Sequence, residues 1–388
     1  MSRLARALCA VGCVLFSAVA VVISTAQAKE TVKIAFIGPL TGGNSAAGLG
    51  PRNSAMLAVQ QKNADPNARF EYEMTALDDE CKPNVGIQVA TKVAADKSII
   101  AALPHYCSAV GIATVDIYNK FGLPVVFWGA ILPAITYGND YPQIHRVSGT
   151  MISEVKVAAE FLAKSGYKRI AVVQDTTDYG NSFSKYFNEE IAKTDAKILA
   201  QFPVSPDQQD LTAELTKIKE LKPDLVFLCG LTPLGVRLRT QMERVGLNVQ
   251  FAGVSGIMTS GYLEGAKDAA EGTVATHNGA PIDSYAGGAA FLEAYKAAGF
   301  REDPDAYGPF AYAATNLVMD AIEKVGPDRK KVTAQLNGTK GFKSLIGEIN
   351  FDDHRQNIVS AHIYVVQDGK WTYWPRSEYA TGLRKLKQ

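Results

Sequence analysis

The residues of this chain best suited to binding a ligand stand where predicted strands end. Ser108 follows a buried apolar run and opens a predicted helix, so its hydroxyl and the first backbone N–H groups of that helix could hold an anion such as a carboxylate. On position alone, a plain helix cap is the other interpretation. Open α/β sheets bind ligands at the carboxyl ends of their strands. Loops of suitable composition after several strands therefore predict one ligand cleft. Five strand ends are rich in glycine, serine or threonine: 38–43, 104–108, 127–130, 174–180 and 253–256.

Motifs for catalysis and metal binding do not assemble in this sequence. Its five histidines are not spaced as a zinc pair. Residues 48–53 form only a broken GxGxxG motif, and residues 253–256 place the second glycine one position too early for a nucleophile elbow. We therefore predict that the protein is not an enzyme and that it uses no metal and no cofactor.

Composition places the chain among ordinary globular proteins. It has 388 residues, of which 47% are hydrophobic and 20% charged, which favours two or three folded domains over disorder or coiled coil. The formal net charge is +1, so no charge surplus attracts the protein to nucleic acid. We predict no nucleic-acid partner.

Residues 1–28 have the pattern of a secretory signal peptide. Arg3 and Arg6 precede an apolar run over 7–23, and Ala26 and Ala28 provide a cleavage site of the AxA type. The apolar run is shorter than the roughly 20 residues that span a bilayer, which disfavours a membrane anchor. Cys13 only faintly imitates a lipid-attachment site. We predict export followed by cleavage.

Three cysteines remain after this cleavage, and an oxidising compartment favours pairing two of them. Cys229 lies in a continuous apolar run and is predicted to be a buried core residue. Cys81 and Cys107 are therefore expected to form a structural disulfide, worth roughly 3 kcal/mol by the chain-entropy model.

Short β-branched runs alternate with amphipathic stretches along the mature chain, which predicts an α/β fold with parallel sheets. Two sheets of four to five strands each fit the pattern better than one large sheet. The tail has helical stretches at 286–298 and 312–325 and two closing strand segments. The sequence does not decide to which sheet these elements belong. The predicted strands start at Val32, Glu71, Ile99, Pro124, Arg169, Ala196, Asp224, Val249 and Gly272; the predicted helices include 50–63, 85–96, 111–121, 151–164, 211–220 and 234–245.

Several short motifs, in this order and spacing, resemble the leucine/isoleucine/valine-binding protein family, the type 1 periplasmic solute-binding proteins of ABC importers. The motifs are KIAFIGPLTGG, DDECKP, HYCS, DIY at 116–118 and AVVQDTTDYG. The resemblance implies the type 1 periplasmic binding protein fold, with two Rossmann-like lobes joined by three hinge crossovers and a ligand cleft between them. It implies an N-terminal lobe of 29–148 plus 280–352, a C-terminal lobe of 149–279 plus 353–388, and hinges near Ser148, Asn278 and Asp353. Family members also carry the disulfide expected here.

Carrying the family's binding residues onto this chain changes the expected ligand. Ser108 keeps the position of a serine that grips the ligand carboxylate, and Gly129 matches a small residue that offers backbone groups. Ile131 replaces a threonine that contacts the amino-acid backbone, and Ser255 replaces the glutamate that binds the ligand ammonium. An ammonium buried without a counter-ion costs several kcal/mol, so a standard α-amino acid is disfavoured.

Aromatic residues and free space complete the expected pocket. Ala47 stands where the family often has a tyrosine, Trp128, Tyr106 and Tyr307 offer flat walls, and Tyr179 matches a tyrosine across the cleft. These features favour an aromatic or alicyclic carboxylate. Two alternatives stay open: the aromatic residues fill the core, or Asp79, Asp175 or Asp178 replaces the missing ammonium-binding acid. The expected ligand-binding residues are Ser108, Tyr106, Gly129, Ala130, Ile131, Trp128, Tyr179, Ser255, Tyr307 and Ala47.

Together these features predict the periplasmic substrate-binding component of an ABC importer. Its partners would be a small carboxylate ligand and the membrane permease subunits, and the protein is expected to be a monomer. A branched-chain or other amino-acid-binding protein of the same family is the alternative. A ligand-sensing receptor of the same fold is another, and an enzyme is the least favoured class.

Overall fold

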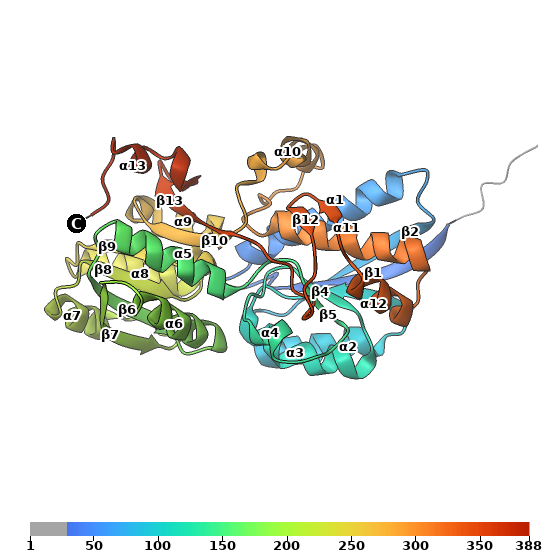
Figure 1. Ribbon diagram of the computed structural model, residues 1–388, viewed down its shortest axis with the longest axis horizontal. Helices are drawn as coiled ribbons and strands as arrows, with labels where there is room; N and C mark the ends of the chain where they lie inside the picture. Colours follow the sequence, from blue (N-terminus) through green and yellow to red (C-terminus); the bar gives the residue numbers. More distant parts are fainter. Residues whose placement is uncertain (1–28, 388) are drawn as a thin grey trace, which may run out of the picture.

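The computed structural model describes residues 29–387, and the predicted signal peptide lies outside this range. Two α/β lobes lie side by side along the long axis of the molecule (Figure 1). The first lobe is defined as residues 29–148 and 280–352, and the second lobe is defined as residues 149–279 and 353–387. Within the described range, no helix has both the length and the apolar character needed to cross a membrane.

The first lobe is built on a sheet of five parallel strands. Its central strands are apolar on both faces because helices cover both sides of a parallel sheet. The strands are β1 (Glu30–Gly38), β2 (Phe70–Asp78), β3 (Ile99–Leu103), β4 (Val125–Phe127) and β5 (Ile144–Arg146), in the spatial order β2-β1-β3-β4-β5. The helices between them are α1 (Ala46–Ala64), α2 (Pro83–Ala95), α3 (Ser108–Phe121) and α4 (Ala134–Tyr137).

The second lobe has a larger, mixed sheet. Its parallel strands are β6 (Arg169–Asp175), β7 (Lys197–Val204), β8 (Leu225–Cys229), β9 (Gln250–Gly253) and β10 (Val274–Asn278). Its helices are α5 (Met151–Lys164), α6 (Asp178–Ile191), α7 (Thr212–Glu220), α8 (Thr232–Arg244) and α9 (Ser260–Ala266). Two further strands, β13 (Ala361–Gln367) and β14 (Lys370–Tyr373), extend the sheet to the order β14-β13-β10-β9-β8-β6-β7.

This second sheet corrects the expectation of four to five parallel strands. The last apolar run of the chain is not one strand, because a turn at Asp368 and Gly369 folds it into an antiparallel hairpin. β13 also pairs antiparallel with β10. The sheet therefore has seven strands and is mixed rather than parallel.

The segment between β10 and β13 packs on the first lobe. Helix α11 (Gly308–Val325) lies along α1, and its apolar face joins the same buried cluster as β1. Figure 1 shows α11 running beside α1 although they lie far apart in the sequence. The other elements of this segment are α10 (Gly288–Ala297), α12 (Arg329–Asn337), β11 (Phe342–Ser344) and β12 (Gly347–Ile349).

The chain therefore passes between the two sheets three times, and the crossing segments contact one another. The backbone of Arg146, at the end of β5, donates to Arg355 O at 3.1 Å and accepts from Asn357 N at 2.9 Å. The side chain of Asn278, at the end of β10, donates to Thr150 O at 3.1 Å. These bonds hold the three crossings side by side.

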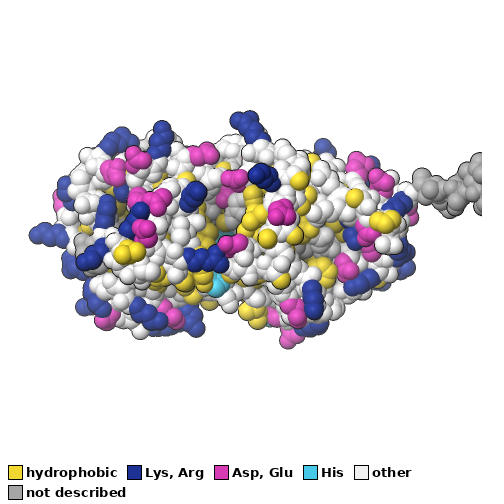
Figure 2. Space-filling view, turned by 90° about the horizontal axis from the view of Figure 1, so that it is seen from above, with side chains coloured by type: hydrophobic (Ala, Val, Ile, Leu, Met, Phe, Trp, Pro, Cys, Tyr) yellow, Lys and Arg dark blue, Asp and Glu magenta, His cyan; other side chains and the backbone are white. Residues whose placement is uncertain are grey.

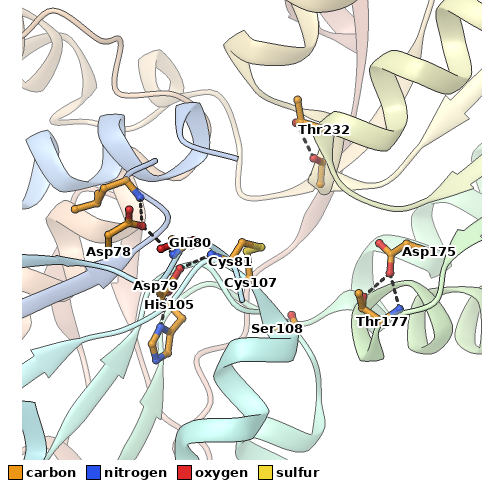
Figure 3. Close-up of a disulfide and its surroundings, with 12 residues drawn as sticks. Asp78, Asp79, Glu80, Cys81, His105, Cys107, Ser108, Asp175, Thr177 and Thr232 are labelled. Atoms are coloured by element: carbon orange, nitrogen blue, oxygen red, sulfur yellow. Dashed lines mark hydrogen bonds and ion pairs between the residues drawn. A yellow bond between two sulfur atoms is a disulfide. The ribbon is translucent and has the colours of Figure 1, made fainter. Parts of the chain in front are cut away.

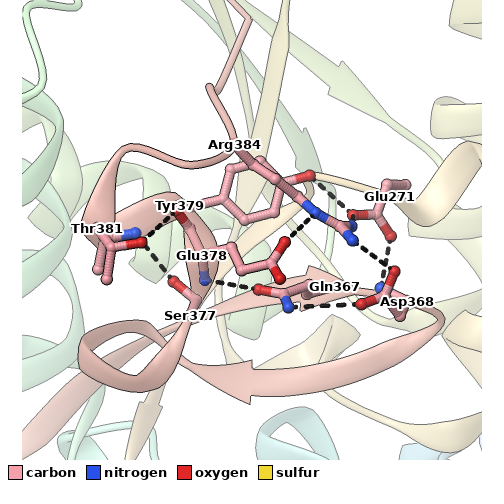
Figure 4. A network of polar contacts seen from close by, with 9 residues as sticks. Glu271, Gln367, Asp368, Ser377, Glu378, Tyr379, Thr381 and Arg384 are labelled. Carbon is pink, nitrogen blue, oxygen red and sulfur yellow. Dashed lines mark hydrogen bonds and ion pairs between the residues drawn. The ribbon is translucent and has the colours of Figure 1, made fainter.

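A polar network fixes the end of the chain to the second lobe (Figure 4). Arg384 forms ion pairs with Glu271, Asp368 and Glu378 at 2.9, 2.8 and 2.6 Å. Tyr379, in the short helix α13 (Glu378–Thr381), donates to Glu271 at 2.8 Å. On the face that Figure 2 displays, basic and acidic side chains are intermixed over both lobes, in agreement with the formal net charge of +1.

Candidate functional site

A cavity of about 540 Å³ lies between the carboxyl ends of the two sheets. This volume falls in the range of small-molecule sites, roughly 300–1,000 Å³. Two buried polar atoms of its lining, Asn44 Oδ1 and Arg237 Nε, have no hydrogen-bond partner among residues 29–387. The lining comes from both lobes: residues 41–44, 80–84 and 107–109 of the first, and 175, 177, 179, 206, 207, 231, 233, 234 and 237 of the second.

Ser108 lies in the first turn of α3 and lines this cavity. Its Oγ accepts hydrogen bonds from the backbone N–H groups of Ile131 and Leu132, both at 3.2 Å. A hydroxyl has two acceptor sites and one donor, so these two bonds leave the O–H free to donate. The backbone N–H groups of Ser108 and Ala109, at the start of α3, have no acceptor within the helix, and they favour a negative charge at the same place.

The disulfide beside Ser108 has its own polar support (Figure 3). Cys81 and Cys107 are paired as expected, with a Cα–Cα distance of 5.4 Å, and Cys229 is buried and unpaired. The Asp79 carboxylate accepts from Cys81 N at 2.9 Å and contacts His105 Nδ1 at 2.7 Å. This arrangement fixes the segment that carries the disulfide to the end of β3.

The loop after β4 depends on a glycine and on a buried arginine. A Cβ atom at Gly129 would lie 3.1 Å from the Cα atom of Tyr106, so a larger residue would push two backbones apart. The guanidinium of Arg146, which is fully buried, donates to Ala130 O at 3.1 Å and to Leu132 O at 2.6 Å. Burial lowers the pKa of Arg146 to about 9. Arg146 thus fixes the loop whose N–H groups hold Ser108, a role that was not predicted from sequence.

The predicted aromatic walls form one buried cluster in the first lobe. The rings of Tyr106 and Tyr307 meet edge to face at 5.4 Å between centroids, and Trp128 stacks on Tyr106 at 6.2 Å. Trp128 also stacks on Phe36 at 5.2 Å and donates a hydrogen bond to Leu103 O, so it supports Tyr106 from within the core. Ala47 belongs to the same cluster. None of these four predicted pocket residues is among those that line the cavity.

From the second lobe, Tyr179 lines the cavity, whereas Ser255 lies in a buried turn outside its lining. A Cβ atom at Gly256 would lie 2.7 Å from Tyr179 Oη, so this glycine lets the Tyr179 ring lie against the turn that carries Ser255. Ser255 is fully buried and its backbone N–H donates to Glu154 Oε2 at 3.1 Å. Glu154, which was not predicted from sequence, stands directly behind the position where the family has an acid.

The three acids considered as ammonium partners lie in different environments. Both oxygens of Asp79 are engaged by His105 and Cys81, and Asp178 is exposed at the start of α6. Asp175 lines the cavity, but its Oδ1 accepts from Thr177 and from Gly180 N. Burial raises the pKa of Asp175. Of the three acids, Asp175 is the one that borders the cavity.

A partly buried acid also joins the lobes at their seam. Asp305, in the first lobe, accepts from Ser260 N at 3.2 Å and from Ser260 Oγ at 3.3 Å at the start of α9 in the second lobe. The backbone of Asp305 has φ of 55°, in the left-handed region. Burial raises the pKa of Asp305 from 3.8 to about 6. This contact between the lobes was not predicted from sequence.

Replacing Asp305 with asparagine should change how stability depends on pH. The folded-state pKa exceeds the unfolded value, so the extra stability that Asp305 provides is complete below about pH 4 and is lost as pH rises through about 6. Between pH 4 and pH 7 we expect the wild type to lose about 2 kcal/mol relative to Asp305→Asn. Urea denaturation at four pH values measures this, with Asp140→Asn, at an exposed position of the same lobe, as the control. Parallel pH profiles for Asp305→Asn and the wild type would contradict the assignment.

Comparison with known proteins adds three results. A leucine-, isoleucine-, valine-, threonine- and alanine-binding protein from Pseudomonas aeruginosa is 29% identical, over 87% of this chain and 91% of its own length. A leucine-binding protein from Thermotoga maritima has a TM-score of 0.82 at 24% identity, over 88% of this chain and 97% of that one. A solute-binding protein of an ABC transporter from R. palustris, in complex with benzoate, has a TM-score of 0.80 at 19% identity, over 88% and 95%. The two solved structures establish the fold.

A family model described as periplasmic binding protein matches residues 31–370, which is most of the chain. Members of this family bind solutes for transport and do not transform them, in agreement with the prediction that the protein is not an enzyme. The two-lobed α/β fold and the family resemblance predicted from sequence are both confirmed. The chain therefore belongs to the periplasmic binding protein family of ABC-transporter type.

Proposed function

We propose that this protein binds a small aromatic or alicyclic carboxylate in the periplasm and delivers it to the membrane permease subunits of an ABC importer. The observation that carries the proposal is the Ser108 hydroxyl, whose two acceptor sites are filled by backbone N–H groups while its O–H stays free to donate at the cavity. A carboxylate oxygen is the natural acceptor for that O–H.

The aromatic character rests on Tyr179, which lines the cavity, and on the buried rings of Tyr106 and Tyr307, which lie outside its lining. Tyr106, Tyr179 and Tyr307 are almost fully buried, and edge-to-face and stacked contacts with an aromatic ligand would extend the ring cluster already present. Ile131 offers no side-chain hydrogen bond to an amino-acid backbone, and Ser255 offers no charge to an ammonium. The benzoate complex of the R. palustris relative supports this ligand class within the fold.

The mechanism we propose is closure of the two lobes around the ligand. The lining of the cavity comes from both lobes, so a bound ligand stabilises the arrangement in which they meet. The permease subunits would recognise this closed form, and a monomer is sufficient for such delivery.

Replacing Ser108 with alanine should weaken the binding of benzoate by roughly 1.5 to 3 kcal/mol, about 10- to 150-fold in Kd, because a hydrogen bond to a charged carboxylate is lost. Isothermal titration calorimetry on protein freed of co-purified ligand measures the change. Benzamide, which has the same ring without the charge, is the control ligand and should lose much less. Equal losses for benzoate and benzamide would mean that Ser108 only supports the loop at 131–132.

Amino-acid binding is the second candidate function, and the Pseudomonas aeruginosa relative favours it. A thermal-shift panel of benzoates, aliphatic acids, leucine and valine separates the two. Ligand at 100 times its Kd adds about 2.7 kcal/mol of stability, which shifts the melting temperature by several degrees. A shift with leucine or valine alone would overturn the aromatic ligand and leave the transport function in place.

A further inference from the structure

The cavity between the lobes has a buried inner end and an exposed outer end. Ser108 and Tyr179 are buried, whereas residues 82–84 and Asp207, which line the same cavity, are exposed. Residues 82–84 belong to the first lobe and Asp207 to the second, so both lobes reach the outer end. A ligand that is held at Ser108 and is long enough can therefore extend from the inner end to the outer end.

The cation that the second lobe contributes to the cavity lining is Arg237. It lies in α8, and its Nη2 donates to Pro206 O, which fixes the guanidinium beside the loop after β7. Its Nε is buried and makes no hydrogen bond among residues 29–387. Leaving a buried donor without an acceptor is costly, so a ligand atom that accepts from this N–H would remove that cost.

The charge of Arg237 is not neutralised at close range. No ion pair within 4.0 Å involves Arg237 in the described part of the chain. Burial lowers the pKa of Arg237, and the charge of Asp207, which follows Pro206 directly, acts against this effect. A guanidinium stays protonated in proteins. Since Asp207 is exposed, water screens its charge, and Arg237 remains able to bind another anion.

The other charged groups of the lining are already engaged. Lys82 pairs with Glu80 at 2.7 Å, and both side chains are largely exposed to water. Asp175 Oδ1 accepts from Thr177 and from Gly180 N. Burial raises the pKa of Asp175, which reduces its negative charge and so reduces its repulsion of an anion in the cavity.

The first-lobe wall offers a second unpaired polar group. Asn44 Oδ1 is buried, lines the cavity and makes no hydrogen bond within the described range. A half-turn of the Asn44 amide about its Cβ–Cγ bond exchanges Oδ1 for Nδ2, which donates. Asn44 and Arg237 come from opposite lobes, so a ligand that engages both would bridge the lobes.

We infer that Arg237 is a second anion anchor of the cleft, so that the protein binds elongated dicarboxylates, with one carboxylate at Ser108 and the other at the Arg237 guanidinium. This inference rests on the proposed function, because it assumes that Ser108 holds one carboxylate of the ligand. The unpaired Nε–H of Arg237 donates to the second carboxylate in a charge-assisted hydrogen bond. Because Ser108 belongs to the first lobe and Arg237 to the second, such a ligand ties the two lobes together.

The test uses benzoates with a para carboxyalkyl arm, from carboxymethyl to carboxybutyl, and compares each with the para-alkyl benzoate of the same length. Calorimetry of the wild type should show one arm length that binds about 10-fold more tightly, or better, than its alkyl counterpart. In Arg237→Met this advantage should disappear, because methionine fills the space but neither donates nor carries charge. Arg244→Met, at an exposed position at the end of the same helix, should keep the advantage.

Asp207→Asn provides an independent check. Removing the acid beside Arg237 should strengthen the binding of the best carboxyalkyl benzoate several-fold, because a competing anion is gone. An unchanged or weaker affinity in Asp207→Asn would contradict the inference, even if Arg237→Met did not fold.

The failures of the inference and of the proposed function are distinguishable. If the alkyl benzoates bind and the carboxylate arm adds no affinity at any length, the second anchor fails and the proposed function stands. The same conclusion holds if Arg237→Met keeps the advantage of the arm. If no benzoate of either series binds the wild type, both fail together.

Discussion

Asp79→Ala is expected to lower the free energy of unfolding by about 3 to 5 kcal/mol, because two buried donors lose their acceptor at roughly 1 to 3 kcal/mol each. Asp79 and His105 are both fully buried, with 2.7 Å between Oδ2 and Nδ1. His105 Nε2 lies 2.8 Å from the hydroxyl of Tyr118, which is also buried. Removing the carboxylate leaves His105 Nδ1 and the backbone N–H of Cys81 without their acceptor.

Asp79→Asn is the matched control for this prediction. An asparagine can accept from Cys81 N and donate to His105 Nδ1, provided that His105 changes tautomer and donates through Nε2 to Tyr118. We expect the asparagine variant to lose less than half as much stability as the alanine variant in urea denaturation. Equal losses, or a loss below about 1 kcal/mol for alanine, would contradict a stabilising role for the hydrogen bonds that link Asp79, His105 and Tyr118.

Removing the disulfide by Cys81→Ala together with Cys107→Ala is expected to lower the free energy of unfolding by about 3 kcal/mol. Without the cross-link, the unfolded chain regains the conformational entropy that the closed loop had removed. The two cysteines are 26 residues apart in the sequence. Binding should weaken as well, because Ser108 follows Cys107 directly. Denaturation with and without a reductant measures the first effect, and calorimetry with benzoate measures the second.

The control for the disulfide is Cys229→Ala, which removes a buried thiol but no covalent bond. Its stability should not respond to the reductant. A wild-type unfolding midpoint that stays the same after full reduction would rule out a stabilising disulfide. Because Asp79 holds Cys81, the effects of Asp79→Ala and of removing the disulfide should not add.

Much of the fold was predictable because parallel strands covered on both faces need continuous β-branched runs. The run from Arg169 to Asp175 and the helix from Met151 to Lys164 were predicted with the boundaries that the structure has. Strand β5, Ile144–Arg146, was missed because three residues that include a histidine and an arginine carry no apolar pattern. The closing hairpin was missed because apolar residues stand on both sides of its turn, so the pattern of the whole run predicts one strand.

The first-lobe part of the site was easier to predict than the second-lobe part. Ser108 could be found from its place after a strand, whereas Glu154 was hidden within a helix rich in charged residues. A signal for Glu154 was present, because the buried face of α5 follows the helical period through Met151, Glu154, Val155 and Ala158. A charged residue on an apolar stripe marks a buried acid, but the sequence does not show which partners it meets.

The three crossings also determine when the protein can fold. The core of the first lobe combines Ile34 and Phe36 from the beginning of the chain with Val318 and Ile322 from near its end, all in one buried cluster. Contacts of such long sequence separation raise the contact order and slow folding, since a large loop must close before they form. During synthesis the N-terminal half therefore lacks part of its core until helix α11 has been made. The chain stays unfolded for longer, which is the condition a polypeptide needs if it is to be threaded through a membrane before it folds.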